Sequence, residues 1–246
     1  MTKLAAAAYQ PDLVAAWKEA CDLIANQKVV DYVLVTSFGN AWEGTADQRS
    51  ALDKAAKAAR AETPSSVASM LLPNIVRTST QAPSDAIEAA QKMLGRGRRK
   101  GLSYSGWRHT YFERLTGAWY NRRGTKETIS QNRLLKTIEK INEWEKNAEA
   151  VFYLHTNLDT DNFRPRGSPC LQYVQFRIFG ASHLSVVGLY RAHDYTNKAL
   201  GNFIGLHDLG IFVASRTGRT FVGADVLSLN PFVGNKSQIN GYIASI

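Results

Sequence analysis

A cysteine opens an apolar run directly after a turn-like segment, in the stretch Arg166-Gly-Ser-Pro-Cys170-Leu-Gln-Tyr-Val-Gln-Phe176. The thiolate is the form of cysteine that attacks an electrophile, and positive charge nearby favours that form. Arg164 and Arg166 stand just upstream, so we expect them to lower the pKa of the thiol. The pattern predicts a nucleophile at a turn-to-strand edge. The competing interpretation is that Cys170 is a small buried apolar side chain, as most free cysteines are.

Three segments in order resemble thymidylate synthases and the related pyrimidine hydroxymethylases. Pro169-Cys-Leu-Gln172 with Gln175-Phe176 is similar to the nucleophile strand of that family. Arg191-Ala-His-Asp194 is similar to its Arg-Ser-x-Asp segment, and Asn202 stands eight residues later, at the base-reading position. Upstream, Pro83-Ser-Asp-Ala-Ile-Glu88 resembles the helix that carries the catalytic glutamate, and Tyr111-Phe-Glu-Arg-Leu115 resembles a further family segment. The resemblance extends over approximately residues 83–233.

The resemblance implies a cysteine-dependent transferase acting on carbon 5 of a pyrimidine nucleotide. Cys170 would add to carbon 6, and Glu88 would move protons near the carbonyl on carbon 4. Substrate contacts are implied for Arg166, Gln175, Arg191, Asp194 and Asn202. Asn202 favours uracil over cytosine, because cytosine-directed relatives place Asp there. Methylation and hydroxymethylation both stay open, as do plain structural roles: a solvated Glu88, an Arg191–Asp194 ion pair, a capping Asn202 and a core-edge Gln175.

The implied cofactor is 5,10-methylenetetrahydrofolate, and the implied assembly is a homodimer packed through the sheet face. Several nucleotide-holding groups of the family are nevertheless replaced. Its sugar-binding His-x-Tyr corresponds to Phe232 and Gly234, its serine to Ala192, and only Lys146 stands where paired arginines are expected. The transferase stays the favoured function because the cysteine site is intact, and these replacements leave open an alternative, in which the chain is a catalytically silent binding or scaffolding protein with the same fold.

The bulk composition predicts one main domain over residues 1–246, with residues 1–64 a divergent and largely helical N-terminal part. Forty-four per cent of the residues are hydrophobic, which suffices for a sizeable core. No apolar run approaches the roughly 20 residues that cross a bilayer, and the N-terminus lacks a signal pattern, so we expect a cytoplasmic protein without membrane contact. Cys21 and Cys170 are the two cysteines, and neither has the spacing of a metal site.

The formal net charge of +9 favours anionic partners. The densest basic run, residues 95–101, is a candidate for holding phosphate or nucleic acid, and it is also a candidate replacement for the missing phosphate-binding arginines. A short basic, glycine-rich loop is more often a solvated connector, so nucleic acid is not the favoured partner.

Hydrophobic periodicity predicts helices and strands interleaved in one α/β or α+β domain. Helical spacing occurs at residues 13–24, 83–94, 131–146 and 203–214, and Gly95 lies where a C-terminal cap is expected. β-rich runs occur at 29–36, 151–154, 171–179 and 184–190, and residues 39–49 are typical of a loop. The family resemblance implies a thymidylate synthase-like mixed sheet with flanking helices. Cys21, His193 and His207 are expected to pack inside the core.

Overall fold

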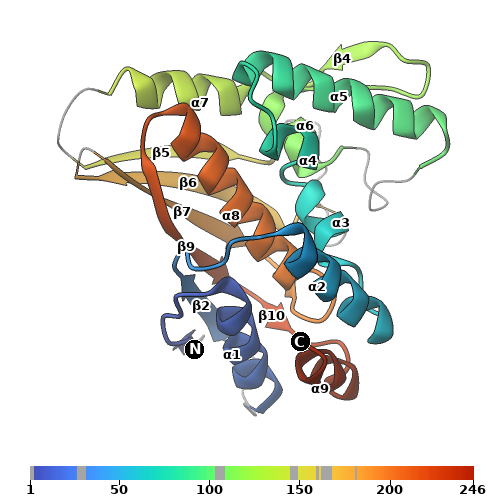
Figure 1. The fold of residues 1–246 in the computed structure, drawn as a ribbon, viewed down its shortest axis with the longest axis vertical. Helices are drawn as coiled ribbons and strands as arrows, with labels where there is room; N and C mark the ends of the chain where they lie inside the picture. The colour runs from blue at the N-terminus through green and yellow to red at the C-terminus, as the bar shows by residue number, and fades with distance from the viewer. Residues whose placement is uncertain are drawn as a thin grey trace.

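The computed structural model describes residues 3–26, 32–102, 109–144, 149–158, 161, 168–180 and 182–246. It is a mixed α/β fold with a six-stranded sheet in the order β1-β2-β9-β7-β6-β5 (Figure 1). β1 pairs parallel with β2 and β7 with β9, while the other neighbours are antiparallel. The strands are β1 (Lys3–Ala6), β2 (Tyr32–Phe38), β5 (Ala150–His155), β6 (Leu171–Phe179), β7 (His183–Tyr190) and β9 (Thr220–Ser228).

Two small ladders and the described helices complete the fold. β3 (Ala118–Tyr120) pairs with β4 (Lys126–Thr128), and β8 (His193–Asp194) pairs with β10 (Pro231–Phe232). The helices are α1 (Leu13–Asn26), α2 (Ala46–Ala58), α3 (Pro64–Ser69), α4 (Asn74–Arg77), α5 (Pro83–Arg99), α6 (Tyr111–Thr116), α7 (Arg133–Asn142), α8 (Ala199–Arg216) and α9 (Lys236–Ala244).

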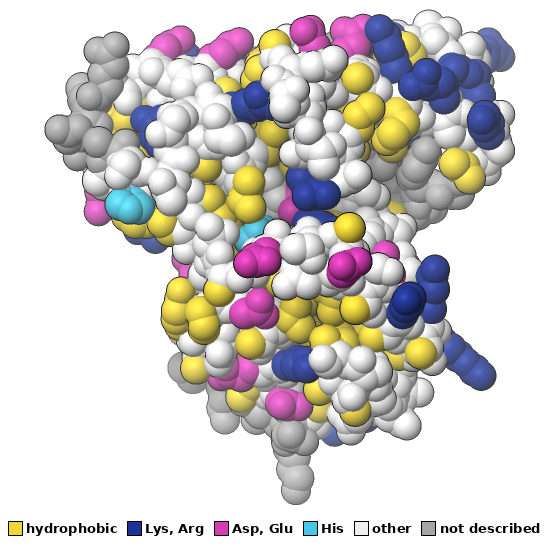
Figure 2. Space-filling model, viewed as in Figure 1, with side chains coloured by type: hydrophobic (Ala, Val, Ile, Leu, Met, Phe, Trp, Pro, Cys, Tyr) yellow, Lys and Arg dark blue, Asp and Glu magenta, His cyan; other side chains and the backbone are white. Residues whose placement is uncertain are grey.

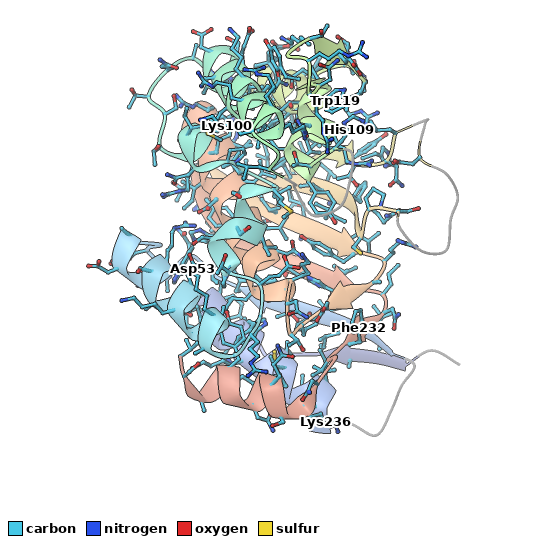
Figure 3. The ribbon with its side chains drawn as sticks, turned by 90° about the vertical axis from the view of Figure 1, so that its right-hand side faces the viewer. Asp53, Lys100, His109, Trp119, Phe232 and Lys236 are labelled. Carbon is cyan, nitrogen blue, oxygen red and sulfur yellow. The ribbon has the colours of Figure 1, made fainter. Side chains whose placement is uncertain are left out.

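Strand β6 shows how alternation divides the sheet into two faces. Val174, Phe176 and Ile178 are buried in the core that α1, α7 and α8 cover, whereas Gln175 points to the opposite face. Figure 3 shows the described helices gathered to one side of the strands. The other face keeps apolar side chains at least partly exposed on every strand: Leu4, Val33, Val35, Val151, Tyr153, Tyr173, Val187, Leu189 and Leu227.

Helix α8 lies across the covered face of the sheet and is buried along most of its length (Figure 1). It connects the parallel strands β7 and β9 and packs on both. Gly201 allows α3 to approach closely, since a Cβ at that position would lie 2.5 Å from Cβ of Val67. The first turn of α8 therefore lies beside α3, and this contact forms one side of the candidate site.

The predicted strands at 151–154, 171–179 and 184–190 and the predicted helices at 13–24 and 203–214 are confirmed to within a few residues. The predicted helix at 131–146 is confirmed over Arg133–Asn142, and its last two residues lie outside the described residues. The prediction that the N-terminal region is mostly helical is wrong at residues 3–6, which form strand β1 at the edge of the sheet. The predicted loop at 39–49 ends early, because Thr45 and Gln48 form a capping box that starts α2 at Ala46. Part of the predicted strand at 29–36 lies outside the described residues.

The prediction that Gly95 ends its helix is also wrong. Helix α5 continues to Arg99, and Gly101 at φ +82° closes it: the Gly101 amide donates to the Arg98 carbonyl and the Leu102 amide to that of Gly97. These two bonds are the Schellman pattern, in which a left-handed glycine follows the last helical turn. Gly95 has a packing reason instead, since a Cβ there would lie 2.3 Å from Cβ of Tyr120 on β3.

The basic run at 95–101 is consequently the end of a helix and not a loop. Arg98 is buried and donates to both carboxylate oxygens of Glu113, at 2.6 and 2.5 Å. Its neighbours Arg96, Arg99 and Lys100 are exposed, and Figure 2 shows Lys and Arg side chains gathered over this end of α5. Across the part of the chain that the structure describes, no helix is both long and apolar enough to cross a membrane.

Candidate functional site

A cavity of about 200 Å³ brings together three residues that the sequence singles out, Cys170, Asp194 and Asn202. They come from the start of β6, from β8 and from the first turn of α8. The remaining walls come from α3 and the residue after it, from the start of α6, from the β8–α8 connection and from β10, and they consist of Val67, Met70, Tyr111, Ala192, His193, Lys198 and Phe232. The cavity is mostly apolar with a few convergent polar groups, as small-molecule sites are.

Tyr111 fixes the backbone at Cys170. Its hydroxyl oxygen accepts hydrogen bonds from the amides of Cys170 and Leu171, at 3.1 and 3.0 Å. Thr110 and Glu113 form a capping box that starts α6 at Tyr111, so the backbone position from which the tyrosine side chain extends is fixed. Tyr111, which also lines the cavity, therefore holds the backbone at the start of β6 through its hydroxyl.

Arg191 holds the turn that precedes the cysteine. Its guanidinium donates to the carbonyls of Ser168 and Pro169, and its amide donates to the Cys170 carbonyl at 2.9 Å. Arg164 and Arg166, which the sequence predicts to lower the thiol pKa, lie outside the described residues. Burial raises the pKa of the Cys170 thiol above its ordinary value, and the charges of Arg191 and Lys198 oppose that rise only in part. The net effect of these described groups on the Cys170 thiol is a raised pKa, which disfavours the thiolate.

Asp194 and Lys198 are one turn apart at the entry to α8. Asp194 accepts from the amides of Thr196 and Asn197 and from the Asn197 side chain, so its carboxylate shapes the turn as well as lining the cavity. Lys198 forms an ion pair with Glu62 and lines the same cavity. The sequence analysis did not select Lys198, although it stands four residues from both Asp194 and Asn202.

Asn202 is held by a buried histidine. Its Nδ2 lies 3.1 Å from Nε2 of His193, and Nδ1 of His193 lies 2.8 Å from the Ser228 hydroxyl. The prediction that His193 packs in the core is confirmed, since its ring stacks on Tyr190 with centroids 4.1 Å apart. The sequence analysis missed the contact between His193 and Asn202, because the spacing of the two residues does not indicate it. Cys21 and His207 are buried as expected.

Glu88 and Gln175 are not brought to the cavity. Glu88 lies on the exposed side of α5, where it pairs with Lys92 and Lys126, and these lysines lower the pKa of its carboxyl group. Gln175 lies on the open face of the sheet and accepts from the Tyr173 hydroxyl at 3.0 Å. The structure thus supports the solvated interpretation of Glu88 and a surface position for Gln175. Arg166 and Lys146 lie outside the described residues.

Some of the positions at which the sequence departs from the family pattern lie at the cavity. Phe232 and Ala192 line the cavity, and Phe232 is in register with Asp194 in the β8–β10 ladder. Gly234 donates its amide to the Thr196 hydroxyl, next to the same turn. None of the basic residues 96–100 lines this cavity, so the hypothesis that they replace the missing phosphate arginines is not supported here.

The cavity volume limits what this site holds. About 200 Å³ suits a single ring, because pockets for drug-sized ligands measure roughly 300–1,000 Å³. Within the described residues, no group of three or more His, Cys, Asp or Glu side chains is arranged to hold a metal ion. No protein-family model and no curated protein sequence matches the chain.

Proposed function

We propose that the protein binds a pyrimidine ring in the Cys170 cavity and attacks its carbon 6, as part of methyl or hydroxymethyl transfer to carbon 5. The observation that carries the proposal is the convergence of Cys170, Asp194 and Asn202 on one small cavity from separate segments. A nucleophile, an amide able to read a ring edge and apolar walls are the groups that this chemistry requires. We propose with it a thymidylate synthase-like fold, on the strength of the mixed sheet and the order of these segments.

In the proposed reaction, the Cys170 thiol gives its proton to the Asp194 carboxylate, which lines the same cavity, and Sγ of the resulting thiolate forms a bond to carbon 6. The electron pair of the C5–C6 double bond then moves onto carbon 5 and the oxygen on carbon 4, which makes carbon 5 nucleophilic. Asn202 stabilises that charge by donating from its amide at the ring edge. The charges of Arg191 and Lys198 ease this deprotonation, because they lower the pKa of the Cys170 thiol against the larger rise that burial causes.

Two elements of this function stay predictions from sequence resemblance. Methylenetetrahydrofolate as the one-carbon donor is one, and it rests on the resemblance alone. The proton-moving role of Glu88 is the other, since Glu88 is exposed on α5. Asp194 is the carboxylate among the described cavity residues, and Tyr111 supplies a hydroxyl beside the nucleophile.

A specific observation favours the second candidate function, a binding protein without catalysis. Burial raises the pKa of the Cys170 thiol, which disfavours the thiolate, and Glu88 is not at the cavity. A protein of this kind would bind the pyrimidine ring through Asn202 and release it unchanged. The uracil preference and the nucleotide form of the ligand belong to both candidates.

Intact-protein mass spectrometry separates the two. The protein is incubated with 5-fluoro-dUMP, with and without methylenetetrahydrofolate, and compared with Cys170→Ala and with Cys21→Ala as the matched control for the buried cysteine. A mass increase that survives in Cys21→Ala and disappears in Cys170→Ala supports the transferase. Binding by calorimetry without any adduct would replace it by the silent binding protein, and the absence of both would overturn the proposed function.

We also propose a homodimer through the open face of the sheet. Tyr153, Val151 and Leu4 are 59, 54 and 74% exposed there, and half-buried valines and leucines join them into one apolar surface. Surfaces of this kind mark protein–protein contacts. Val187→Glu should give monomers in sedimentation equilibrium, whereas Ile211→Glu, an exposed apolar position on α8, should not. A wild-type monomer would exclude the dimer.

A further inference from the structure

A chain of buried polar groups runs from the cavity into the core. It links Asn202 to His193, His193 to Ser228 at 2.8 Å, and Ser228 to the Tyr195 hydroxyl at 3.1 Å. The four side chains are at most 6% exposed. Tyr195 Oη lies 3.5 Å from Thr36 Oγ1 on β2. The chain therefore connects the cavity to strands β9 and β2 without a formal charge.

The histidine in this chain is neutral and has a defined tautomer. An amide nitrogen donates and cannot accept, so Nε2 of His193 accepts from Asn202 and the ring proton resides on Nδ1. Nδ1–H then donates to Ser228. Complete burial lowers the pKa of His193 to about 3, so the ring keeps its single proton at neutral pH.

The ring itself has little freedom to reorient. It stacks on Tyr190 with an interplanar angle of 7° and touches Tyr195 and Phe203 on its other sides. A flipped Asn202 amide would place its oxygen against the lone pair of Nε2. That arrangement becomes favourable only if the proton moves to Nε2 and the Ser228 hydroxyl reverses its direction, so the flip requires rearrangement along the chain.

We propose that His193 is a positioning residue that locks the Asn202 amide, so that the cavity selects between ring edges with opposite hydrogen-bonding patterns. With Nδ2 turned toward His193, Asn202 has its Oδ1 and one amide hydrogen left for the cavity. A uracil-type edge offers an N–H donor beside a carbonyl, and a cytosine-type edge offers an amino donor beside a ring acceptor. A locked amide matches one of these in a given pose, whereas an amide free to flip matches both. This inference rests on the proposed function, since it assumes a pyrimidine in the Cys170 cavity.

The first test needs no ligand. In protein labelled with nitrogen-15, the ring-nitrogen chemical shifts of His193 report its tautomer and should show Nδ1 protonated. Ser228→Ala removes the acceptor for that proton and should make the two tautomers comparable in population. A wild-type ring protonated on Nε2 would reverse the amide orientation and overturn the proposal, whatever the ligand is.

The second test measures discrimination. Affinity and adduct formation are compared for 5-fluoro-dUMP and 5-fluoro-dCMP in wild type, His193→Leu and His193→Gln. The leucine variant should lose discrimination by roughly 10-fold, the size of one hydrogen-bonding pair. The glutamine variant should restore it, because its side-chain carbonyl can accept from Asn202. Thermal unfolding of each variant shows whether it is folded, and the glutamine variant keeps the test valid if leucine disturbs the core.

The outcomes distinguish failure of the positioning role of His193 from failure of the proposed pyrimidine-binding function. A wild type that binds neither fluoropyrimidine overturns the proposed function, and the specificity role falls with it. A wild type that discriminates, with unchanged discrimination in a folded His193→Leu variant, overturns the positioning role alone. Reduced discrimination in the leucine variant and recovery in the glutamine variant, with similar unfolding temperatures, would support it.

Discussion

The Asn202–His193–Ser228 chain beside the Cys170 cavity and the junction of α5 with α6 are both built around buried polar side chains, but the chain is neutral and the junction is ionic. At the junction, Arg98 and Glu113 form a bidentate pair, and Arg98 also lies over the ring of Trp119. At the cavity, the chain from Asn202 to Ser228 contains no formal charge. Figure 3 places Trp119 and Phe232, one from each region, well apart on the molecule.

The two regions differ in how many hydrogen-bonding groups remain for a ligand. Glu113 accepts from Arg98, from the Thr110 amide and from the Thr110 hydroxyl, so its oxygens are occupied by the protein itself. Asn202, by contrast, directs its amide nitrogen to His193 in the core, and the residue also lines the cavity. A dense run of charge in a sequence therefore indicates structure as readily as binding, and a half-satisfied neutral amide is the better sign of a site.

The largest expected effect is the loss of stability when the ion pair at the α5–α6 junction is broken. Arg98→Leu leaves the fully buried Glu113 carboxylate without its partner, which should lower the free energy of unfolding by about 3–5 kcal/mol. Urea denaturation measures this. The fluoropyrimidine adduct per folded molecule should be unchanged, because Arg98 does not line the cavity.

Glu88→Gln is the matched control, because it removes a carboxylate from the exposed side of the same region and should leave stability unchanged. The double variant Arg98→Met with Glu113→Leu should regain only part of the loss, since it removes the orphaned charge but leaves the Thr110 amide and hydroxyl without their acceptor. If Arg98→Leu were as stable as wild type, the junction would not be the ionic support described here.

Periodicity in the sequence predicts most of the sheet and the long helices. β6 and α8 follow from strong alternation and from a long apolar helical pattern. Gly95 was misassigned because three glycines occur near the end of α5, and only contact with Tyr120 separates a packing glycine from a capping one. β1 was missed because its alanines fit a helix, and pairing with β2 decides its conformation.

The candidate site was predictable where a motif keeps its spacing and unpredictable where it depends on tertiary contact. Cys170, Asp194 and Asn202 were selected from linear order, and they meet in one cavity. Glu88 was selected on spacing alone, and the helix turns it toward solvent. Lys198 and the His193–Asn202 contact depend on how α8 packs on the sheet, which no local pattern records.

The second effect is on the pH dependence of stability, and it tests whether His193 in the chain beside the cavity is neutral. The pKa of His193 is about 3 in the folded protein and about 6.5 when unfolded. As the pH falls below 6.5 the unfolded chain binds a proton that the folded chain does not, so stability falls. His193→Gln should lack this loss, and wild type should lose about 1 kcal/mol more per pH unit between pH 6 and 4. Parallel pH profiles in urea denaturation would mean that His193 is already charged when folded.

The third effect concerns the nucleophile turn. Tyr111→Phe leaves the amides of Cys170 and Leu171 without their acceptor, which should cost about 1–3 kcal/mol of stability and slow adduct formation. Tyr173→Phe is the control, because its hydroxyl donates to Gln175 on the open face of the sheet. Equal effects of the two substitutions on thermal unfolding would show that Tyr111 does not hold the turn.

The smallest effect distinguishes two helical glycines by sign. Gly95→Ala places a Cβ 2.3 Å from Cβ of Tyr120, so the β3–β4 hairpin must shift, while the better helix propensity of alanine offsets part of the cost. We expect a net loss of about 1 kcal/mol in chemical denaturation. Gly241→Ala in α9 meets no atom within 4 Å and should gain about 0.5–1 kcal/mol. A gain at both positions would mean that the hairpin yields freely, and the close packing that keeps Arg98 buried would then not depend on Gly95.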